Sequence, residues 1–138
     1  AKPLVLMAAG VGITPLMAML QQALPTGRPI TFIHCARSPQ QQAFRRELLA
    51  LAAQHPQLWL RFGYEQDAGP SPAADVEVAE GLPDAALLTR WLPAVRDVQA
   101  YYLGPVGFMR LAKQVLQRAG VPDAQARCEF FGPAESLA

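Results

Sequence analysis

Apolar residues gather in five short runs along the chain, and each run ends in a polar or glycine-rich break. The first run, residues 4–9, has no charge and no alternation of apolar and polar positions, which is typical of a strand buried on both faces of a parallel sheet. The later runs are rich in β-branched and aromatic residues, which favour strands. We therefore expect five strands, over residues 4–9, 30–36, 58–64, 98–103 and 127–131.

Between these runs the apolar residues recur at helical spacing. Proline, glycine and small polar residues stand at the ends of each such segment, where helices usually begin and end. The pattern predicts four helices, over residues 15–24, 39–54, 83–92 and 108–120. Residues 65–81 are rich in Ala, Pro, Gly and acids and predict an exposed loop, with a short extended piece at residues 76–78.

Two of the helices carry clear start signals. Thr14 is a favourable N-cap, and Pro15 suits the first helical position because its missing N–H needs no partner there. Ser38 precedes Pro39, and Gln41 follows three residues after the serine in a capping-box pattern. We expect the first two helices to begin at Pro15 and Pro39.

The alternation of strands and helices predicts one α/β domain over residues 1–138, a doubly wound open parallel sheet of Rossmann-like type with helices on both faces. We expect the strand order 3-2-1-4-5, which places residues 4–9 beside residues 98–103. In such a sheet ligands bind at the carboxyl ends of the strands where the order reverses. Both strands at that point run into glycine turns, residues 10–12 and 104–107.

Composition narrows the classes of function. The 138 residues are 51% hydrophobic and 17% charged, with a net charge of +1 and no long basic run, so neither a nucleic-acid surface nor an anionic membrane surface is indicated. No apolar run approaches the ~20 residues of a membrane span, and we expect a cytoplasmic protein.

Arginine and alanine are frequent and lysine is rare, which suits a bacterial source. The chain lacks an initial methionine and begins almost on a strand, which indicates a fragment.

Cysteine and histidine predict no metal centre. Cys35 and Cys128 both lie in apolar runs without a C-x-x-C pattern, so we expect reduced core residues. His34 lies inside the second run and is expected to be a core histidine with its hydrogen bonds satisfied, while His55 lies in a loop.

The first glycine turn is the strongest candidate for ligand binding. Gly10 and Gly12 can adopt conformations closed to other residues, and they leave the main chain open to a ligand. The unpaired N–H groups of the helix that follows favour a phosphate. Pro15 stands where the usual dinucleotide fingerprint has a third glycine, so a tight turn without a ligand remains an alternative.

Three segments together resemble the NAD(P)-binding half of the ferredoxin–NADP reductase superfamily, and within it the C-terminal domain of bacterial flavohaemoglobins, which are nitric oxide dioxygenases. They are Gly-Val-Gly-Ile-Thr-Pro at residues 10–15, Gly-Pro-Val-Gly-Phe-Met at residues 104–109 and Glu-Phe-Phe-Gly-Pro at residues 129–133. They occur in the order and spacing of the family, and the resemblance covers essentially the whole chain.

The resemblance implies a division of labour. NADH or NADPH would bind here, while FAD and haem would lie in a flavin-binding domain and a globin domain of the same polypeptide. Hydride would pass from nicotinamide to FAD and electrons to haem, where bound oxygen converts nitric oxide to nitrate. No catalytic residue is implied within this chain. The implied cofactor-binding residues are Gly10, Val11, Gly12, Ile13, Thr14, Pro15, Arg37, Ser38, Gly104, Pro105, Val106, Met109, Glu129 and Phe131.

Two positions depart from the family pattern. Leu103 and Phe130 stand where the family usually has cysteine, and the first change removes a thiol close to the nicotinamide. The choice between NADH and NADPH stays open, because no carboxylate ends the second strand and Arg37 with Ser38 could meet a 2′-phosphate. The family prefers NADH.

Two other functions fit the same fold. The first is the NADH-binding domain of an oxygenase or ferredoxin reductase component, in which we would expect an iron–sulfur cysteine cluster nearby. The second is a non-enzymatic nucleotide-binding regulatory module, because fold alone does not determine function. A domain that has lost its ligand is a third possibility.

Overall fold

The protein is described by a computed structural model that covers residues 2–128. Within that range the strands form one parallel sheet in the order β4-β3-β2-β1-β5-β6. The strands are β1 (Leu4–Ala9), β2 (Ile30–Ala36), β3 (Leu58–Tyr64), β4 (Glu77–Glu80), β5 (Gln99–Leu103) and β6 (Ala126–Arg127).

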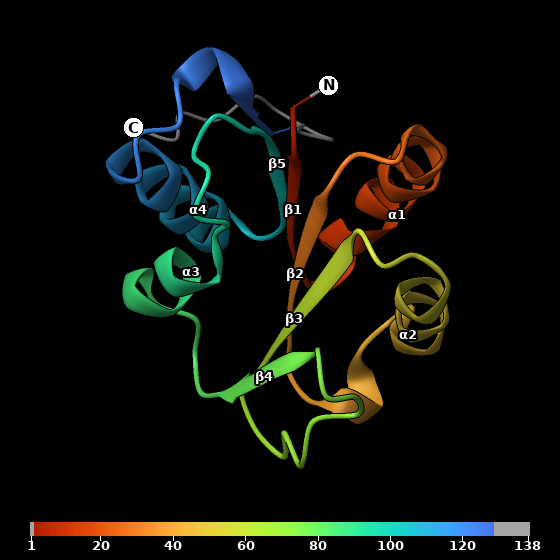
Figure 1. Cartoon of the computed structure of the whole chain (residues 1–138). Coiled ribbons are helices and arrows are strands. Elements are labelled where there is room, and N and C mark those ends of the chain that lie inside the picture. The colour runs from red at the N-terminus through yellow and green to blue at the C-terminus, as the bar shows by residue number, and fades with distance from the viewer. Residues whose placement is uncertain (1, 129–138) are drawn as a thin grey trace.

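Four α-helices cover the sheet (Figure 1). Helices α1 and α2 lie on one face, and α3 and α4 lie on the other. Their bounds are α1 (Ile13–Ala23), α2 (Arg45–Gln54), α3 (Ala85–Trp91) and α4 (Val106–Arg118). The predicted doubly wound architecture is therefore confirmed.

The strand order 3-2-1-4-5 is also confirmed, and one edge strand is added to it. The addition is β4, which pairs with β3 inside the stretch predicted to be a loop and overlaps the extended piece predicted at residues 76–78. Its side chains are half-buried or exposed, so it lacks the apolar run that predicts a buried strand. The last predicted strand, residues 127–131, falls largely outside the described residues, where β6 covers only Ala126–Arg127.

The core is centred on β1. Val5, Leu6, Met7 and Ala8 are all 0% exposed, because this strand has neighbours on both edges and helices on both faces. Cys35 on β2 is also buried and free, as predicted, and burial raises the pKa of its thiol to about 12. Cys128 is free but only half-buried.

The predicted start of the first helix is wrong. Helix α1 begins at Ile13, and a single turn of 3-10 helix, Gly10–Gly12, runs directly into it. The Ile13 N–H already donates to the carbonyls of that turn, so Thr14 lies within the helix and does not cap it. Pro15 is the third helical residue, and it is tolerated there because the first N–H groups of a helix have no partner within the helix.

The predicted start of the second helix is also wrong. Pro39–Gln41 form only one turn of 3-10 helix, and the Ser38 hydroxyl donates to the Gln41 side chain at 3.2 Å without capping any backbone group. Helix α2 begins at Arg45, because Phe44 adopts a left-handed conformation with φ of 62° that breaks the helical path. Phe44 is 36% exposed and therefore lies outside the core.

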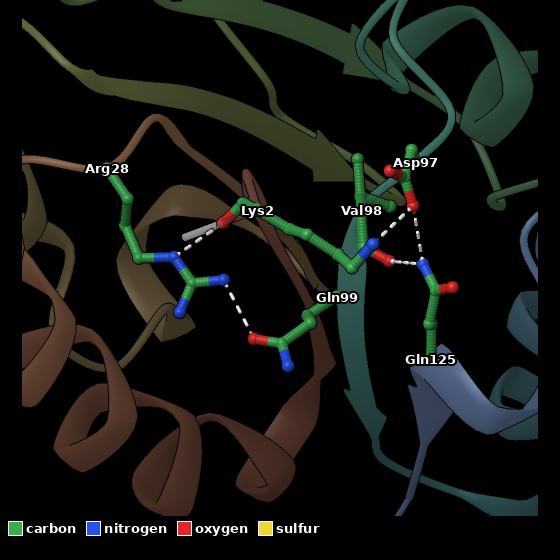
Figure 2. Close-up of polar contacts among 6 residues, drawn as sticks. All are labelled: Lys2, Arg28, Asp97, Val98, Gln99 and Gln125. Carbon is green, nitrogen blue, oxygen red and sulfur yellow. Dashed lines mark hydrogen bonds and ion pairs between the residues drawn. The ribbon is translucent and has the colours of Figure 1, made fainter.

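Polar contacts tie the strands together at the amino edge of the sheet (Figure 2). Arg28 donates to the Lys2 carbonyl at 2.7 Å and to the Gln99 side chain at 2.8 Å. The Lys2 ammonium pairs with Asp97 at 2.7 Å, and Gln125 donates to the same carboxylate at 3.0 Å. These contacts join segments next to β1, β2, β5 and β6.

No helix within residues 2–128 is long and apolar enough to cross a membrane.

Candidate functional site

The two glycine turns meet at the carboxyl ends of β1 and β5. A Cβ atom built on Gly12 would lie 2.4 Å from the Leu103 carbonyl oxygen and 2.8 Å from the Gly104 nitrogen. A Cβ atom on Gly104 would in turn lie 3.1 Å from the Ala9 carbonyl oxygen. Only glycine lets the turns approach this closely, so the convergence expected from the strand order is present.

The geometry changes the interpretation of Gly12. Its φ is −63°, an ordinary helical value, and the space that its missing side chain leaves is filled by the second turn. Gly12 therefore serves packing between the turns and does not leave the main chain open to a ligand.

Gly10 has the opposite character. Its φ of +56° is left-handed, and a Cβ atom there would have no neighbour within 4 Å. The backbone of Gly10 thus borders open space at the beginning of the turn that leads into α1. Among the two glycines of the first turn, this is the one that a ligand can approach.

A hollow of about 290 Å³ opens at Gly10. Its wall combines the first turn, the start of α1, the end of β2 and the segment after it, and the residues described there include Arg37 but no acid. The volume is at the lower limit of typical small-molecule sites, roughly 300–1,000 Å³, so the hollow has room for part of a dinucleotide. The lining residues are Gly10, Val11, Ile13, Thr14, His34, Ala36, Arg37, Gln41 and Ala43.

A buried hydrogen-bond chain ends in the wall of this hollow. The Arg45 guanidinium donates to the Tyr64 hydroxyl at 3.4 Å, and that hydroxyl donates to the Gln42 side-chain oxygen. The Gln42 amide nitrogen lies 2.9 Å from His34 Nδ1. The other ring nitrogen, His34 Nε2, is buried and makes no hydrogen bond of ordinary geometry, with only the Gly10 backbone beside it. The prediction of a core histidine with satisfied hydrogen bonds is therefore wrong for this atom.

Burial controls the titration of two members of this hydrogen-bonded series, His34 and Tyr64. It lowers the pKa of His34 to about 4, while a weak hydrogen bond with the Gly10 backbone has a smaller, opposing effect. Burial raises the pKa of Tyr64, while its hydrogen bond from Arg45 acts in the opposite direction. At neutral pH the imidazole is therefore uncharged and the phenol keeps its proton.

The structure brings only some of the predicted site residues to the hollow. Gly10, Val11, Ile13, Thr14 and Arg37 line it, and Gly12 lies behind it. Ser38 is 4% exposed, bonds to the lining residue Gln41 and is not among the residues described as lining the hollow.

The remaining predicted residues lie elsewhere. Pro15 contributes to a separate, very small pocket beside Tyr101 and Leu103. Gly104, Pro105 and Val106 form the second turn and the start of α4, and Met109 is 3% exposed on that helix. Glu129 and Phe131 lie outside the described residues.

Four lining residues were not predicted as site residues: Ala36 and Ala43, which have no polar side chain, and the polar Gln41 and His34. Gln41 carried a capping signal only, and the apolar surroundings of His34 indicated a core position. The register could have identified the histidine, because His34 pairs with Ala8 one position before the carboxyl end of β1. Within residues 2–128 no group of three or more His, Cys, Asp or Glu side chains could hold a metal ion.

Comparison with known proteins identifies related chains. The family model described as "Oxidoreductase NAD-binding domain" matches residues 6–114. A flavohemoprotein from Pseudomonas putida is 54% identical over 136 residues, which cover 99% of this chain and 34% of that protein. This chain therefore spans about a third of the length of that curated relative.

Solved structures of related proteins share this fold. The FAD/NAD-binding domain of a nitric oxide dioxygenase from Vibrio cholerae superposes with a TM-score of 0.77 at 30% identity, covering 96% of this chain and 52% of that chain. A flavohemoglobin from Malassezia yamatoensis with bound FAD and haem gives a TM-score of 0.74 at 26% identity, covering 95% of this chain and 32% of that one.

The packing of the two turns can be tested with a pair of glycine substitutions. We expect Gly12→Ala to lower the free energy of unfolding by about 1–3 kcal/mol, because the new methyl group overlaps the Leu103 backbone. Gly107→Ala is the control, since a Cβ there meets nothing within 4 Å, and it should leave stability unchanged or slightly raised. Urea denaturation measures both, and equal stabilities for the two variants would contradict the close approach.

The buried histidine makes stability depend on pH. The pKa of His34 is about 4 in the folded chain and about 6.5 when unfolded, so the unfolded state binds more protons in this range and stability falls with falling pH. Between pH 7 and pH 5 the loss from this group is about 2 kcal/mol. Denaturation of His34→Gln should show a shallower pH dependence, and His55→Gln should retain the full slope. A His34→Gln slope equal to that of the parent chain would refute the depressed pKa.

Proposed function

Since the chain belongs to the family of oxidoreductase NAD-binding domains, we propose that it is the NAD(P)H-binding part of a flavohemoprotein. In that protein it presents the nicotinamide to FAD held by another domain of the same polypeptide. The proposal is supported by 54% identity to a flavohemoprotein of which this chain matches 34%. The remaining two thirds of that relative leave room for a flavin domain and a haem domain.

The observation that carries the binding function is the hollow beside Gly10. Its open glycine backbone, the start of α1 and the cationic Arg37 suit the phosphates of a dinucleotide, and the described lining residues include no carboxylate that would repel them. Polar Thr14 and Gln41 add hydrogen-bonding capacity at the same wall. The residues present therefore fit the adenosine and pyrophosphate half of the nucleotide.

We assign the nicotinamide half to the second turn, at Gly104, Pro105 and Val106. This turn is in contact with the first through Gly12, so one extended ligand can cross from one turn to the other at the carboxyl edge. Glu129 and Phe131, which follow β6 in the chain, would approach the flavin.

The role of this domain in the reaction is to position the nucleotide. When bound, the nicotinamide supplies a hydride to FAD. The residues of this domain hold the nucleotide and orient it, and they need not donate or accept protons. In the full-length protein we propose that the electrons serve conversion of nitric oxide to nitrate, in line with the nitric oxide dioxygenase whose FAD/NAD-binding domain shares this fold.

We propose NADH as the preferred nucleotide. Arg37 is the only cation among the described residues of the hollow, and Ser38 is buried against Gln41. A 2′-phosphate would therefore meet a single charged partner, which gives NADPH little advantage.

A titration with NADH and NADPH tests the binding function. Val11 is 91% exposed at the tip of the first turn, so Val11→Glu should place a negative charge beside the phosphates without disturbing the core. We expect about a tenfold weaker Kd for NADH, equal to ~1.4 kcal/mol. Leu82→Glu, which makes the same change at a 73% exposed position between β4 and α3, should bind as the parent chain does.

Calorimetry of the 138-residue chain gives both Kd values and the choice of nucleotide. Parent chain that binds neither NADH nor NADPH at millimolar concentration, or equal weakening by both glutamate variants, would overturn the assignment of the hollow.

The flavin partnership is tested in a chimera. Replacing the matched 136-residue segment of the Pseudomonas putida flavohemoprotein with this chain should preserve NADH-driven flavin reduction, followed by stopped-flow absorbance. The same chimera with Val11→Glu should need about tenfold more NADH for the half-maximal rate. A folded chimera that binds NADH but leaves its flavin oxidised would refute the proposed role in hydride transfer.

A further inference from the structure

The hydrogen-bond chain behind the hollow has a defined direction. Arg45 can only donate, so the Tyr64 hydroxyl accepts from it and gives its own proton to the Gln42 oxygen. The Gln42 amide nitrogen then faces His34 Nδ1 at 2.9 Å as a donor. The proton of a neutral imidazole must in that case be on Nε2.

This arrangement keeps His34 as a neutral donor. Burial opposes the charged form of the ring and lowers its pKa to about 4, so Nδ1 stays free to accept from Gln42 at physiological pH. The same burial raises the pKa of Tyr64, which keeps the hydroxyl proton that orients Gln42. Two titratable groups are thus held in the protonation states that the chain of hydrogen bonds requires.

The donor at the end of this series of hydrogen bonds has only a weak partner, the Gly10 backbone. His34 is 1% exposed, and its buried Nε2 makes no hydrogen bond of ordinary geometry, although the Gly10 backbone lies beside it. Buried polar groups are nearly always paired, so such an atom needs an explanation. His34 lies in the wall of the hollow together with Gly10, Thr14 and Arg37, where a bound ligand would supply the missing acceptor.

We propose that His34 is a binding residue of the nucleotide site, whose Nε2–H donates to a phosphate oxygen of the dinucleotide, and that Gln42 and Tyr64 are positioning residues that fix its tautomer. The inference rests on the proposed nucleotide-binding function and deepens it. A neutral donor adds a hydrogen bond to the anion, and Arg37 supplies the charge. Phosphate is the acceptor best matched to the glycine turn beside the ring.

Nitrogen-15 NMR of the histidine rings tests the proposal directly on the parent chain. We expect the free protein to show a protonated Nε2 and an unprotonated Nδ1 at His34. Saturating NADH or ADP should shift the Nε2–H resonances, and adenosine, which lacks phosphate, should not. His55, which lies in the turn before β3, serves as the internal control and should not respond.

Affinity measurements on variants separate donation from packing. His34→Gln retains an N–H donor near the Nε2 position and should bind NADH within about threefold of the parent. His34→Phe keeps the ring volume without either nitrogen and should bind at least about tenfold more weakly. Tyr64→Phe removes the group that orients Gln42, so we expect a mixture of His34 tautomers by NMR and a weakening of about threefold.

The outcomes distinguish the role of His34 from the proposed nucleotide-binding function. Parent chain that binds NADH while the His34 Nε2–H resonances stay unchanged would overturn the role of His34 and leave the nucleotide site intact. In that case the nearby Gly10 backbone is the natural partner of the ring. A response to adenosine equal to that to ADP would overturn the phosphate assignment. Absence of binding by NADH and ADP alike would overturn both the site and the inference.

Discussion

The close approach of two turns is the constraint on which the site depends. The missing side chain of Gly12 allows the Leu103 carbonyl to approach to where a Cβ would overlap it, and Gly104 fits less tightly, but still closely, against Ala9. The contact holds the carboxyl ends of β1 and β5 at one depth, so that α1 and α4, on opposite faces of the sheet, both begin at its switch point. The first turn packs against the second turn on the side of Gly12. Gly10 lies on its other side, which is left open.

The buried strands of the sheet were predictable, because an uninterrupted apolar run in the sequence indicates a buried strand. Strands β1, β2 and β3 have the predicted bounds, and the neighbours of β1 follow from the right-handed connections of parallel sheets. Strand β4 is half-exposed, so its sequence resembles that of a loop. The helix starts were mispredicted for another reason: Thr14 and Ser38 are good caps in isolation, but tertiary structure inserts a 3-10 turn at each place.

The site was predictable as a location and less so as a set of contacts. The glycines indicated the edge of the sheet at which the hollow opens. Their separate roles depend on which neighbour each one faces, and the sequence does not contain that information. The position of His34 was more predictable than its hydrogen bonds. Its partner Gln42 comes from a loop and Tyr64, which bonds to Gln42, comes from the end of β3, and only the fold brings them together behind the ring. Arg37 was predictable because it directly follows a strand that ends at the ligand edge.

Strand β4 has a consequence for how the chain behaves at high concentration. Exposed sheet edges invite pairing with other molecules, because they present a row of unpaired N–H and C=O groups. This edge strand has only four residues and begins and ends with glutamates, Glu77 and Glu80. A second molecule that extended the sheet there would gain few backbone bonds and would bring its own two carboxylates against the first pair. The β4 edge is therefore protected against the strand-to-strand association through which parallel sheets grow into aggregates.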